Sequence, residues 1–315
     1  MKKIFLAVGV LLFFAACTND AMNDPLADGP VAMTFTAGID AVATRVNSEG
    51  KAFTEDDKVG IVPMKDGDVE TGQFNVLYTY SSDNQFTANP PYWFQDRETV
   101  TFNAYYPYDA ELSTNGVITI DTKAKNQTAG EETVASDWRK NDYLFASNTA
   151  DVSSPTVNFT GMDHTFKHVM SKFTLTLKAG DGISDLQALT GYTLGNFITT
   201  GTFDIKTGNA VPDAEATTEA ISMSVTGENA ETLECEPLIL LPQDIDSGKL
   251  SLTVHYNNQD YHAELKLPEY TVKKLLAGYH YRYTVKVSNT ALEITNASIV
   301  DWTEADNFDG EATLQ

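Results

Sequence analysis

Apolar and polar residues alternate along most of this chain with the two-residue period of a half-buried β-strand. The first such stretch has Val31, Met33, Phe35, Ala37 and Ile39 facing one side, with small or polar residues between them. The alternation returns, after turn residues, at 59–62, 74–80, 92–94, 99–106, 142–147, 156–159, 166–177, 279–287 and 291–302. The region 109–140 is polar and turn-rich, which predicts a long excursion or mobile loop around one weak strand at 117–120.

The C-terminal third contains the most specific local pattern. Residues 257–260, Asn-Asn-Gln-Asp, lie between SLTVHY and YHAELKL, and we expect them to form the loop of a β-hairpin. Pairing Tyr256 with Tyr261 places Leu252 opposite Leu265 and sets the other apolar residues against each other. A slip of one residue would turn all these apolar groups toward solvent, so the pattern favours a single register.

The strands recur at sandwich-like spacing, and no long window has the 3.6-residue period of a helix. The chain is therefore predicted to be all-β, with two β-sandwich domains in tandem. Without its first 17 residues the chain has 315 − 17 = 298, which suits two domains of ordinary size. We expect a signal peptide at 1–17, a polar tether at 18–30, an N-terminal sandwich at 31–160, and a C-terminal sandwich with a tail at 161–315.

The N-terminus, MKKIFLAVGVLLFFAAC, has the form of a secretory signal. Lys2 and Lys3 precede an apolar run that is too short to span a membrane. It ends in Phe-Ala-Ala-Cys, which resembles a bacterial lipobox, although Phe14 stands where that motif usually has Leu. The resemblance implies cleavage before Cys17, acylation of Cys17 and attachment to a membrane outside the cytoplasm. The alternative is a plain signal peptide, cut at a nearby alanine, in which Cys17 is incidental.

Charge and cysteine content narrow the possible partners. The formal charge of −23 becomes −25 when Lys2 and Lys3 leave with the signal. Such an acidic surface repels nucleic acid and anionic lipid. Neither is therefore expected as a partner. Beyond Cys17 only Cys235 is present, which leaves no pair for an intramolecular disulfide. Its setting, LECEPLILLP, predicts a small buried strand residue and not a nucleophile.

No catalytic or cofactor motif is found. Phosphate-loop, dinucleotide, nucleophile-elbow and zinc-protease patterns are missing from the sequence, so we predict no enzyme and no cofactor. His164 and His168 are four residues apart, but on a predicted strand this spacing does not form a metal pair. His255 and His262 face each other across the predicted hairpin, yet no third ligand is evident, so no metal site is expected. An enzyme that uses two of the 44 acidic residues stays open as a weak third hypothesis.

Tyrosines in the N-terminal half allow two interpretations. Tyr78, Tyr80, Tyr105 and Tyr106 could stack on sugar rings, as amphipathic aromatic rings do at binding surfaces. Tyrosine is also simply a good strand residue, and this second interpretation is favoured. Binding of glycans that fails after Tyr105→Ala would support the first.

Several stretches, taken in order behind the lipoprotein-type signal, resemble the fimbrillin-like family, the lipoprotein subunits of type V pili in Gram-negative anaerobes. The set comprises Ala43-Thr44-Arg45, residues 53–61, Trp93 with residues 100–107, residues 142–146, Phe166-Lys167-His168 with Ser171-Lys172-Phe173, and residues 240–243, 276–281 and 299–302. Each motif is weak alone, and the ordered set covers nearly the whole mature chain. Asp56 is a departure, since the family usually has Gly before the following Asp.

The resemblance implies two tandem transthyretin-like β-sandwiches, export as a lipoprotein and, in members that polymerise, removal of the first strand by an Arg-specific protease. The matching position is Arg45, so the processed chain would begin at Val46. Removing the strand at 31–39 would open an apolar groove with unpaired backbone groups, which is costly to leave empty. A strand from the next subunit could refill it by β-augmentation. The alternative for Arg45 is a solvated cation at a strand end.

The family's donor strand is its C-terminal segment, which matches residues 297–315 here. Ile299 and Trp302 are the candidate anchors of that strand, but the apolar residues around them are irregularly spaced.

The function predicted is a structural or adhesive lipoprotein of the cell outer membrane, surface-exposed or fimbrial. It would be a subunit or a tip or anchor component of a type V fimbria, with other pilus subunits and the membrane lipid as partners. Host or bacterial surface molecules are further candidate ligands. The alternative is a monomeric surface lipoprotein that binds a host or dietary glycan or a protein.

Overall fold

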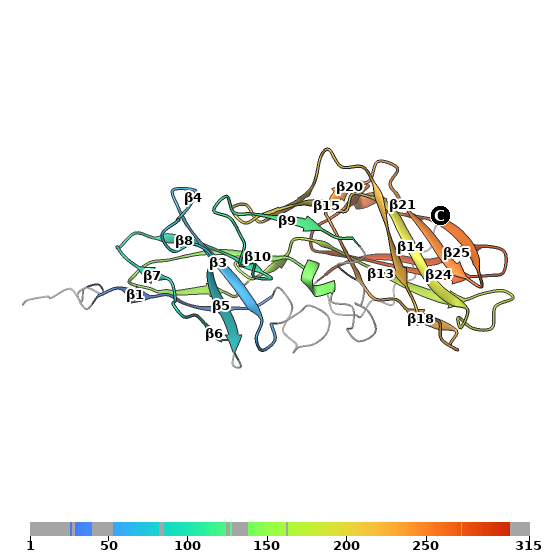
Figure 1. Ribbon diagram of the computed structural model, residues 1–315, viewed down its shortest axis with the longest axis horizontal. Coiled ribbons are helices and arrows are strands. Elements are labelled where there is room, and N and C mark those ends of the chain that lie inside the picture. Colours follow the sequence, from blue (N-terminus) through green and yellow to red (C-terminus); the bar gives the residue numbers. More distant parts are fainter. Residues whose placement is uncertain are drawn as a thin grey trace, which may run out of the picture.

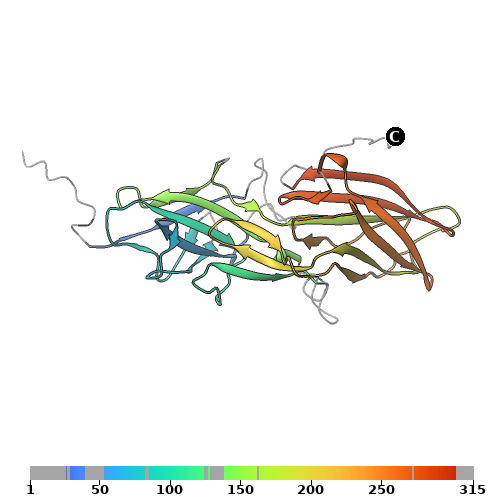
Figure 2. The ribbon, with the colours of Figure 1, turned by 90° about the horizontal axis from the view of Figure 1, so that it is seen from above.

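The structure is a computed structural model that describes residue 26 and residues 29–39, 53–81, 85–123, 127, 138–161, 163–271 and 273–302. Nearly all regular structure in it is β-strand, which confirms the predicted all-β class. Within the described residues two short 3-10 helices, η1 (Trp138–Asn141) and η2 (Glu269–Thr271), accompany the strands. Figures 1 and 2 show an elongated molecule with two lobes end to end, the early strands in one and the late strands in the other.

One large sheet forms the N-terminal lobe, in the order β11-β2-β6-β5-β3-β8-β10-β12 with β4 attached to β3. Its strands are β2 (Thr34–Ala37), β3 (Lys58–Lys65), β4 (Asp68–Val69), β5 (Val76–Ser81), β6 (Gln85–Thr87), β8 (Val100–Tyr106), β10 (Leu144–Ala150), β11 (Thr156–Phe159) and β12 (Lys167–His168). A separate pair joins β1 (Val31–Ala32) to β7 (Trp93–Phe94). The core of this lobe is rich in aromatic side chains, among them Phe35, Tyr78, Phe86, Phe102 and Phe159.

Two sheets form the C-terminal lobe and share one apolar core. The first contains β13 (Ser171–Ala179), β18 (Thr232–Glu234), β19 (Leu238–Leu240), β24 (Tyr279–Val287) and β25 (Leu292–Asp301). The second contains β14 (Leu189–Phe197), β17 (Glu219–Ser224), β21 (Lys249–Tyr256) and β22 (Gln259–Lys266). A small pair joins β20 (Gln243–Asp244) to β23 (Lys274–Leu275). Cys235 is buried, as predicted, but it lies just after β18 and not within a strand.

A third apolar core, the central cluster, lies between the lobes and draws on both. It includes Val62, Tyr105, Ile118, Phe203 and Trp302. It packs against a small sheet of three strands, β9 (Val117–Asp121), β15 (Thr200–Asp204) and β16 (Asn209–Pro212). In this sheet β15 pairs with both β9 and β16. Strand β9 is the weak strand predicted within the polar excursion. Figure 2 shows these later strands reaching to the early ones. The lobes are thus joined by paired strands and common packing, and the domain boundary at residues 160 and 161 stays a prediction.

The predicted hairpin at 250–267 exists, but its predicted register is wrong by two residues. Tyr256 pairs with Gln259 and Leu252 with Ala263, so the loop contains only Asn257 and Asn258. Both asparagines have positive φ, at 51° and 58°, as a two-residue type I′ turn requires, and such a turn matches the twist of the flanking strands. A shift of two residues leaves the apolar face unchanged, which is why alternation alone could not detect the error.

Among the described residues no helix is long and apolar enough to span a membrane. The stretch predicted as one strand at 166–177 divides into β12 and β13, which belong to different sheets. His168 ends β12 in the N-terminal sheet, and Ser171 opens β13 in the C-terminal one. The chain therefore crosses from one lobe to the other at these residues.

Burial of acidic hydroxyl and thiol groups predicts alkaline unfolding. Burial disfavours the charged phenolate and thiolate forms, and so raises the pKa of Tyr78, Tyr143 and Cys235, each to about 12. The folded state therefore favours the protonated forms, and this stabilisation is complete below the ordinary pKa values, near 9 for the thiol and 10 for the tyrosines. It is lost as the pH rises toward 12, at about 1.4 kcal/mol per pH unit for each group.

We expect the urea midpoint to fall steeply from about pH 10 to pH 11.5, and Tyr78→Phe to make that fall shallower. Tyr78→Phe also lowers stability at neutral pH, because the hydroxyl donates to Met33 O and accepts from Tyr92 N. The matched control is Tyr261→Phe on the surface hairpin, which should keep the slope of the unaltered chain. If the urea midpoint of Tyr78→Phe falls with pH as steeply as that of the unaltered chain, the loss of stability does not come from ionisation of Tyr78.

Candidate functional site

Residues 31–39 form the first-strand segment, which begins in β1, continues through β2 and ends in a bridge from Ile39 to Phe166. The predicted facing is confirmed in part. Met33, Phe35, Ala37 and Ile39 are buried in the N-terminal core, whereas Val31 is only partly buried against it. Thr34 and Thr36 point to solvent, and their hydroxyls bond to Thr156 and Asn158 on the neighbouring strand β11.

The backbone of the segment is bound to a sheet neighbour on each side. On one side β2 runs parallel to β11 through four paired residues, extended by Thr34 N–H to Pro155 O at 3.1 Å and Gly38 N–H to Phe159 O at 3.1 Å. On the other side, among the described residues, Thr36 pairs with Gln85 of β6. The segment thus lies inside the sheet, between β11 and β6.

Aromatic rings surround the central residue of the segment. Phe35 stacks on Phe86 with centroids 4.4 Å apart and meets the edges or faces of Tyr78 at 4.9 Å and Phe159 at 5.5 Å. Its side chain is 3% exposed. Removing the segment would therefore uncover three rings and leave β11 and β6 without the strand between them, which is a strongly unfavourable state.

Three of the predicted modification residues, Cys17, Arg45 and Val46, lie outside the described residues, so their roles stay predictions. Their places in the sequence still bear on the segment. The only covalent connection from Ile39 to the rest of the lobe, which resumes at Phe53, is the stretch 40–52, and Arg45 lies within it. A cut after Arg45 would leave the first-strand segment held in the sheet by non-covalent contacts alone.

The two candidate donor anchors are packed in the chain's own fold. Ile299 pairs with Tyr281 on β24 and packs against the C-terminal core. Trp302 is 2% exposed in the central cluster, where its ring stacks on His168 with centroids 3.9 Å apart and planes 9° from parallel. The Lys172 ammonium lies 5.6 Å from the Trp302 ring centroid. A donor role, which stays a prediction, would require β25 to leave β24.

The tyrosines considered for sugar stacking are packing residues, as favoured. Tyr78 and Tyr105 are at most 1% exposed, and Tyr80 and Tyr106 pack against the N-terminal core. Tyr105 cannot serve as a sugar platform, because its ring covers Gly60 and its hydroxyl bonds to Asn75 and Asp109. Sequence reasoning missed Trp93, which is 38% exposed and is the exposed aromatic residue of the described part. The turn residues Pro90-Pro91 just before it were the available indication.

The histidines do not gather into a metal site within the described residues. His168 is buried and bonds through Nδ1 to Asp142 at 2.7 Å, while His164 Nδ1 lies 2.9 Å from Ser147 O. The corrected hairpin register places His255 opposite Asp260, at 2.7 Å, and His262 opposite Thr253. The predicted pairing of His255 with His262 is therefore wrong.

The fimbrillin-like family matches residues 44–302, which is most of the chain. This chain belongs to the fimbrillin-like family. The resemblance inferred from the ordered motifs is thereby confirmed. A search among curated proteins finds no match. The first-strand segment lies just before the matched region, which begins beside Arg45.

Solved structures similar to this fimbrillin-like chain cover nearly all of it. A candidate cell adhesion protein from Bacteroides ovatus is 24% identical over 88% of this chain and 100% of its own, with a TM-score of 0.69. One from Bacteroides uniformis is 25% identical over 88% and 99%, with a TM-score of 0.66. One from Bacteroides fragilis is 16% identical over 88% and 100%, with a TM-score of 0.52. These similarities support the fold.

Proposed function

We propose that this fimbrillin-like chain is an adhesive or structural subunit of a type V fimbria, or its tip or anchor component. It is exported to the outer membrane, lipidated on Cys17, and assembled by strand exchange after a cut at Arg45. The observation that carries this proposal is the first-strand segment. Its inward side chains fill an aromatic core, its backbone pairs with β11, β6 and β7, and its covalent link to the body contains Arg45.

Strand exchange follows from the cost of the vacated position. Loss of residues 31–39 would expose Tyr78, Phe86 and Phe159 together with the open edge of β11. A donor strand from another subunit that places apolar side chains at alternate positions would cover the rings and restore the backbone bonds. Other pilus subunits are therefore the partners this geometry fits best.

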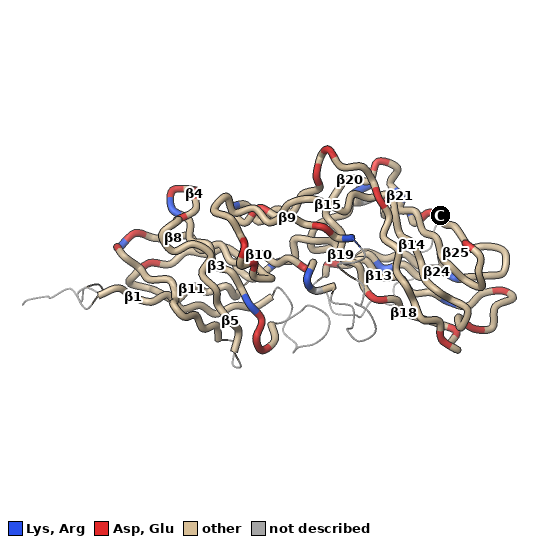
Figure 3. Tube along the Cα trace, viewed as in Figure 1, with Lys and Arg blue, Asp and Glu red and all other residues tan. Residues whose placement is uncertain are grey.

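The high negative charge of the chain is a further reason why assembly would need a specific strand contact. Acidic residues are spread over both lobes in Figure 3, and the chain carries −23 overall, so subunits repel one another at long range. Assembly thus needs buried apolar and backbone contacts, which a donated strand supplies. The same negative charge repels nucleic acid, which we therefore do not propose as a partner.

The first test is Arg45→Ala in native cells. We expect the mature chain to stay in the membrane fraction with an acylated Cys17, whereas the unaltered protein sheared from cells begins at Val46. The measurement is mass spectrometry of the N-terminus in both fractions, with a blot for high-mass polymer. Arg97→Ala, a change of an exposed arginine within the described part, is the matched control and should be processed normally. Polymer formed by Arg45→Ala would contradict the proposal.

A second candidate function is a monomeric surface lipoprotein that binds a glycan or a protein. The packing of Ile299 and Trp302 within the chain's own C-terminal half favours it, because those side chains are already engaged. An acylated Cys17 found only in the membrane fraction, with no chain beginning at Val46, would select this candidate or a fimbrial anchor.

A further inference from the structure

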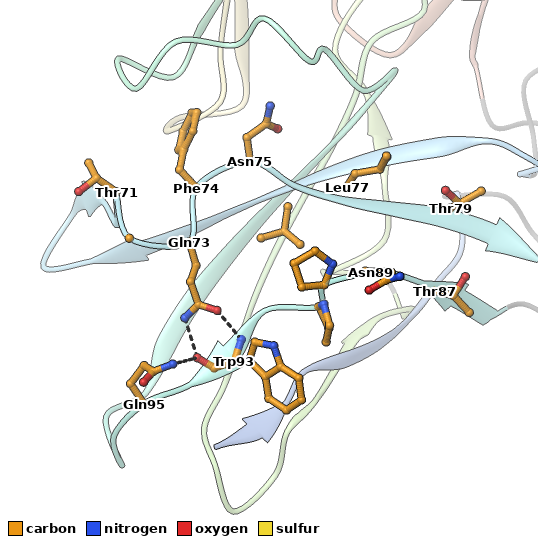
Figure 4. Close-up of a pocket in the computed structure, with 15 residues that line it drawn as sticks. Thr71, Gln73, Phe74, Asn75, Leu77, Thr79, Thr87, Asn89, Trp93 and Gln95 are labelled. Atoms are coloured by element: carbon orange, nitrogen blue, oxygen red, sulfur yellow. Dashed lines mark hydrogen bonds between the residues drawn. The ribbon is translucent and has the colours of Figure 1, made fainter. Parts of the chain in front are cut away.

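A groove of about 1010 Å³ opens on the outer face of the N-terminal lobe, away from the aromatic core. Its base is the solvent-facing side of β5 and β6, where Leu77, Thr79 and Thr87 point outward while Tyr78 points into the core. Gln73 and Trp93 lie side by side at one end (Figure 4). We call this feature the Trp93 groove.

The backbone of Trp93 is fixed while its indole ring is exposed. Trp93 N–H donates to Gln73 Oε1 at 2.6 Å, and Gln73 Nε2 donates to Trp93 O at 2.7 Å, as the dashed lines in Figure 4 show. Trp93 also pairs with Ala32 through β1 and β7. The exposed indole on this fixed backbone is an apolar face already placed for a ligand. This placement reduces the conformational entropy lost on binding.

Among the described residues, the lining carries polar groups but no charge. None of the fifteen residues around the groove is Asp, Glu, Lys, Arg or His, in a chain with a formal charge of −23. Within the described part of the chain, the side chains of Thr79, Thr87 and Asn89 make no hydrogen bond, so their groups face the groove available to a ligand. Hydroxyl and amide groups both donate and accept, which suits a ligand made of hydroxyl groups.

We propose that the Trp93 groove binds a neutral oligosaccharide. One sugar ring would stack its C–H face on the Trp93 indole, while its hydroxyls bond to Thr79, Thr87 and Asn89. A charged glycan fits less well, because the lining offers no cation and acidic residues such as Asp96 lie next to it in sequence. This site goes beyond the proposed function, since binding requires neither processing nor polymerisation.

A peptide strand fits the groove less well than a sugar. Both strands of its base are paired on each side, β5 with β3 and β6, and β6 with β5 and β2. The base therefore presents side chains and no open backbone edge, so β-augmentation has no template here. Recognition must come from an aromatic face and dispersed polar groups, as in a carbohydrate site.

The test uses the purified unprocessed chain and a panel of oligosaccharides. The neutral probes are cellohexaose, maltohexaose, xylohexaose and galactohexaose, and the charged ones are sialyllactose and a heparin hexasaccharide. A proline-rich peptide serves as the peptide arm. Titration calorimetry and indole fluorescence report binding. We expect at least one neutral probe to bind, and neither the charged probes nor the peptide.

Trp93→Ala should weaken binding of that probe at least about tenfold, and Trp93→Phe should retain most of it. Val211→Ala is the matched control, because Val211 is the other large exposed apolar residue of the described part and lies on β16, away from the groove. The proposal is overturned if no neutral probe binds at about 1 mM, if only the peptide or charged probes bind, or if Trp93→Ala binds like the unaltered chain. Trp93→Ala should still be cut at Arg45. A failure of oligosaccharide binding can therefore be told apart from a failure of fimbrial assembly.

Discussion

A chain that begins at Val46 will not keep a folded N-terminal lobe, and a peptide of residues 29–39 added in trans will restore it. The deletion removes Met33, Phe35 and Ile39 from the core. Truncating a buried Phe to Ala costs about 3–5 kcal/mol, and Met or Ile about 2–5 kcal/mol. Their sum reaches the whole stability of an ordinary protein, about 5–15 kcal/mol, so the lobe should open.

Hydrogen exchange of the N-terminal amides measures this directly. Protection should be lost in the shortened chain and should return with added peptide, in proportion to its concentration. The control peptide carries Phe35→Ala, which leaves the three surrounding rings uncovered and should fail to restore protection. Full protection of the shortened chain without peptide would show that the first-strand segment is dispensable, and strand exchange would lose its driving force.

Trp302→Ala should lower the free energy of unfolding by about 3–5 kcal/mol, whereas Trp93→Ala should change it by no more than about 0.5 kcal/mol. Trp302 is buried where the two lobes meet, against His168 and Lys172. Trp93 is partly exposed and holds its place through backbone bonds that the substitution retains. The same substitution thus probes a central packing role in one case and a surface role in the other.

Urea unfolding followed by circular dichroism separates the two variants. Trp302→Ala should also shift protection in both lobes, because the central cluster contains residues from each. If Trp302→Ala is as stable as Trp93→Ala, the central cluster contributes little to the free energy of unfolding. Release of β25 for donation would then cost little free energy.

Alternation along the chain was enough to predict the class and the inward face of the first-strand segment, because burial imposes a two-residue period directly on the sequence. It could not predict which strands meet. The pairing of β9 with β15 and the parallel pairing of β2 with β11 join residues far apart in sequence, and no local pattern encodes these partners. The hairpin register failed for a local reason, the left-handed conformation of Asn257 and Asn258.

The candidate sites were predictable to different degrees. Cys17 and Arg45 belong to short sequence motifs, so local sequence is enough to single them out. The Trp93 groove has no such motif, because it depends on a fold that turns Leu77 and Thr79 outward beneath Trp93. For the tyrosines the favoured packing interpretation is confirmed, but the sequence left both interpretations open, since an aromatic residue on a strand has the same pattern whether its face is covered or open.

The central cluster has a consequence for the order in which the chain completes its fold. Its members extend from Val62 to Trp302, near the end of the chain. Because a chain is synthesised from its N-terminus, the junction between the lobes cannot close until Trp302, which follows β25, has been made. A chain broken off earlier keeps an apolar junction open, and such surfaces attract chaperones and proteases. Only a chain that extends to Trp302 therefore buries the whole central cluster.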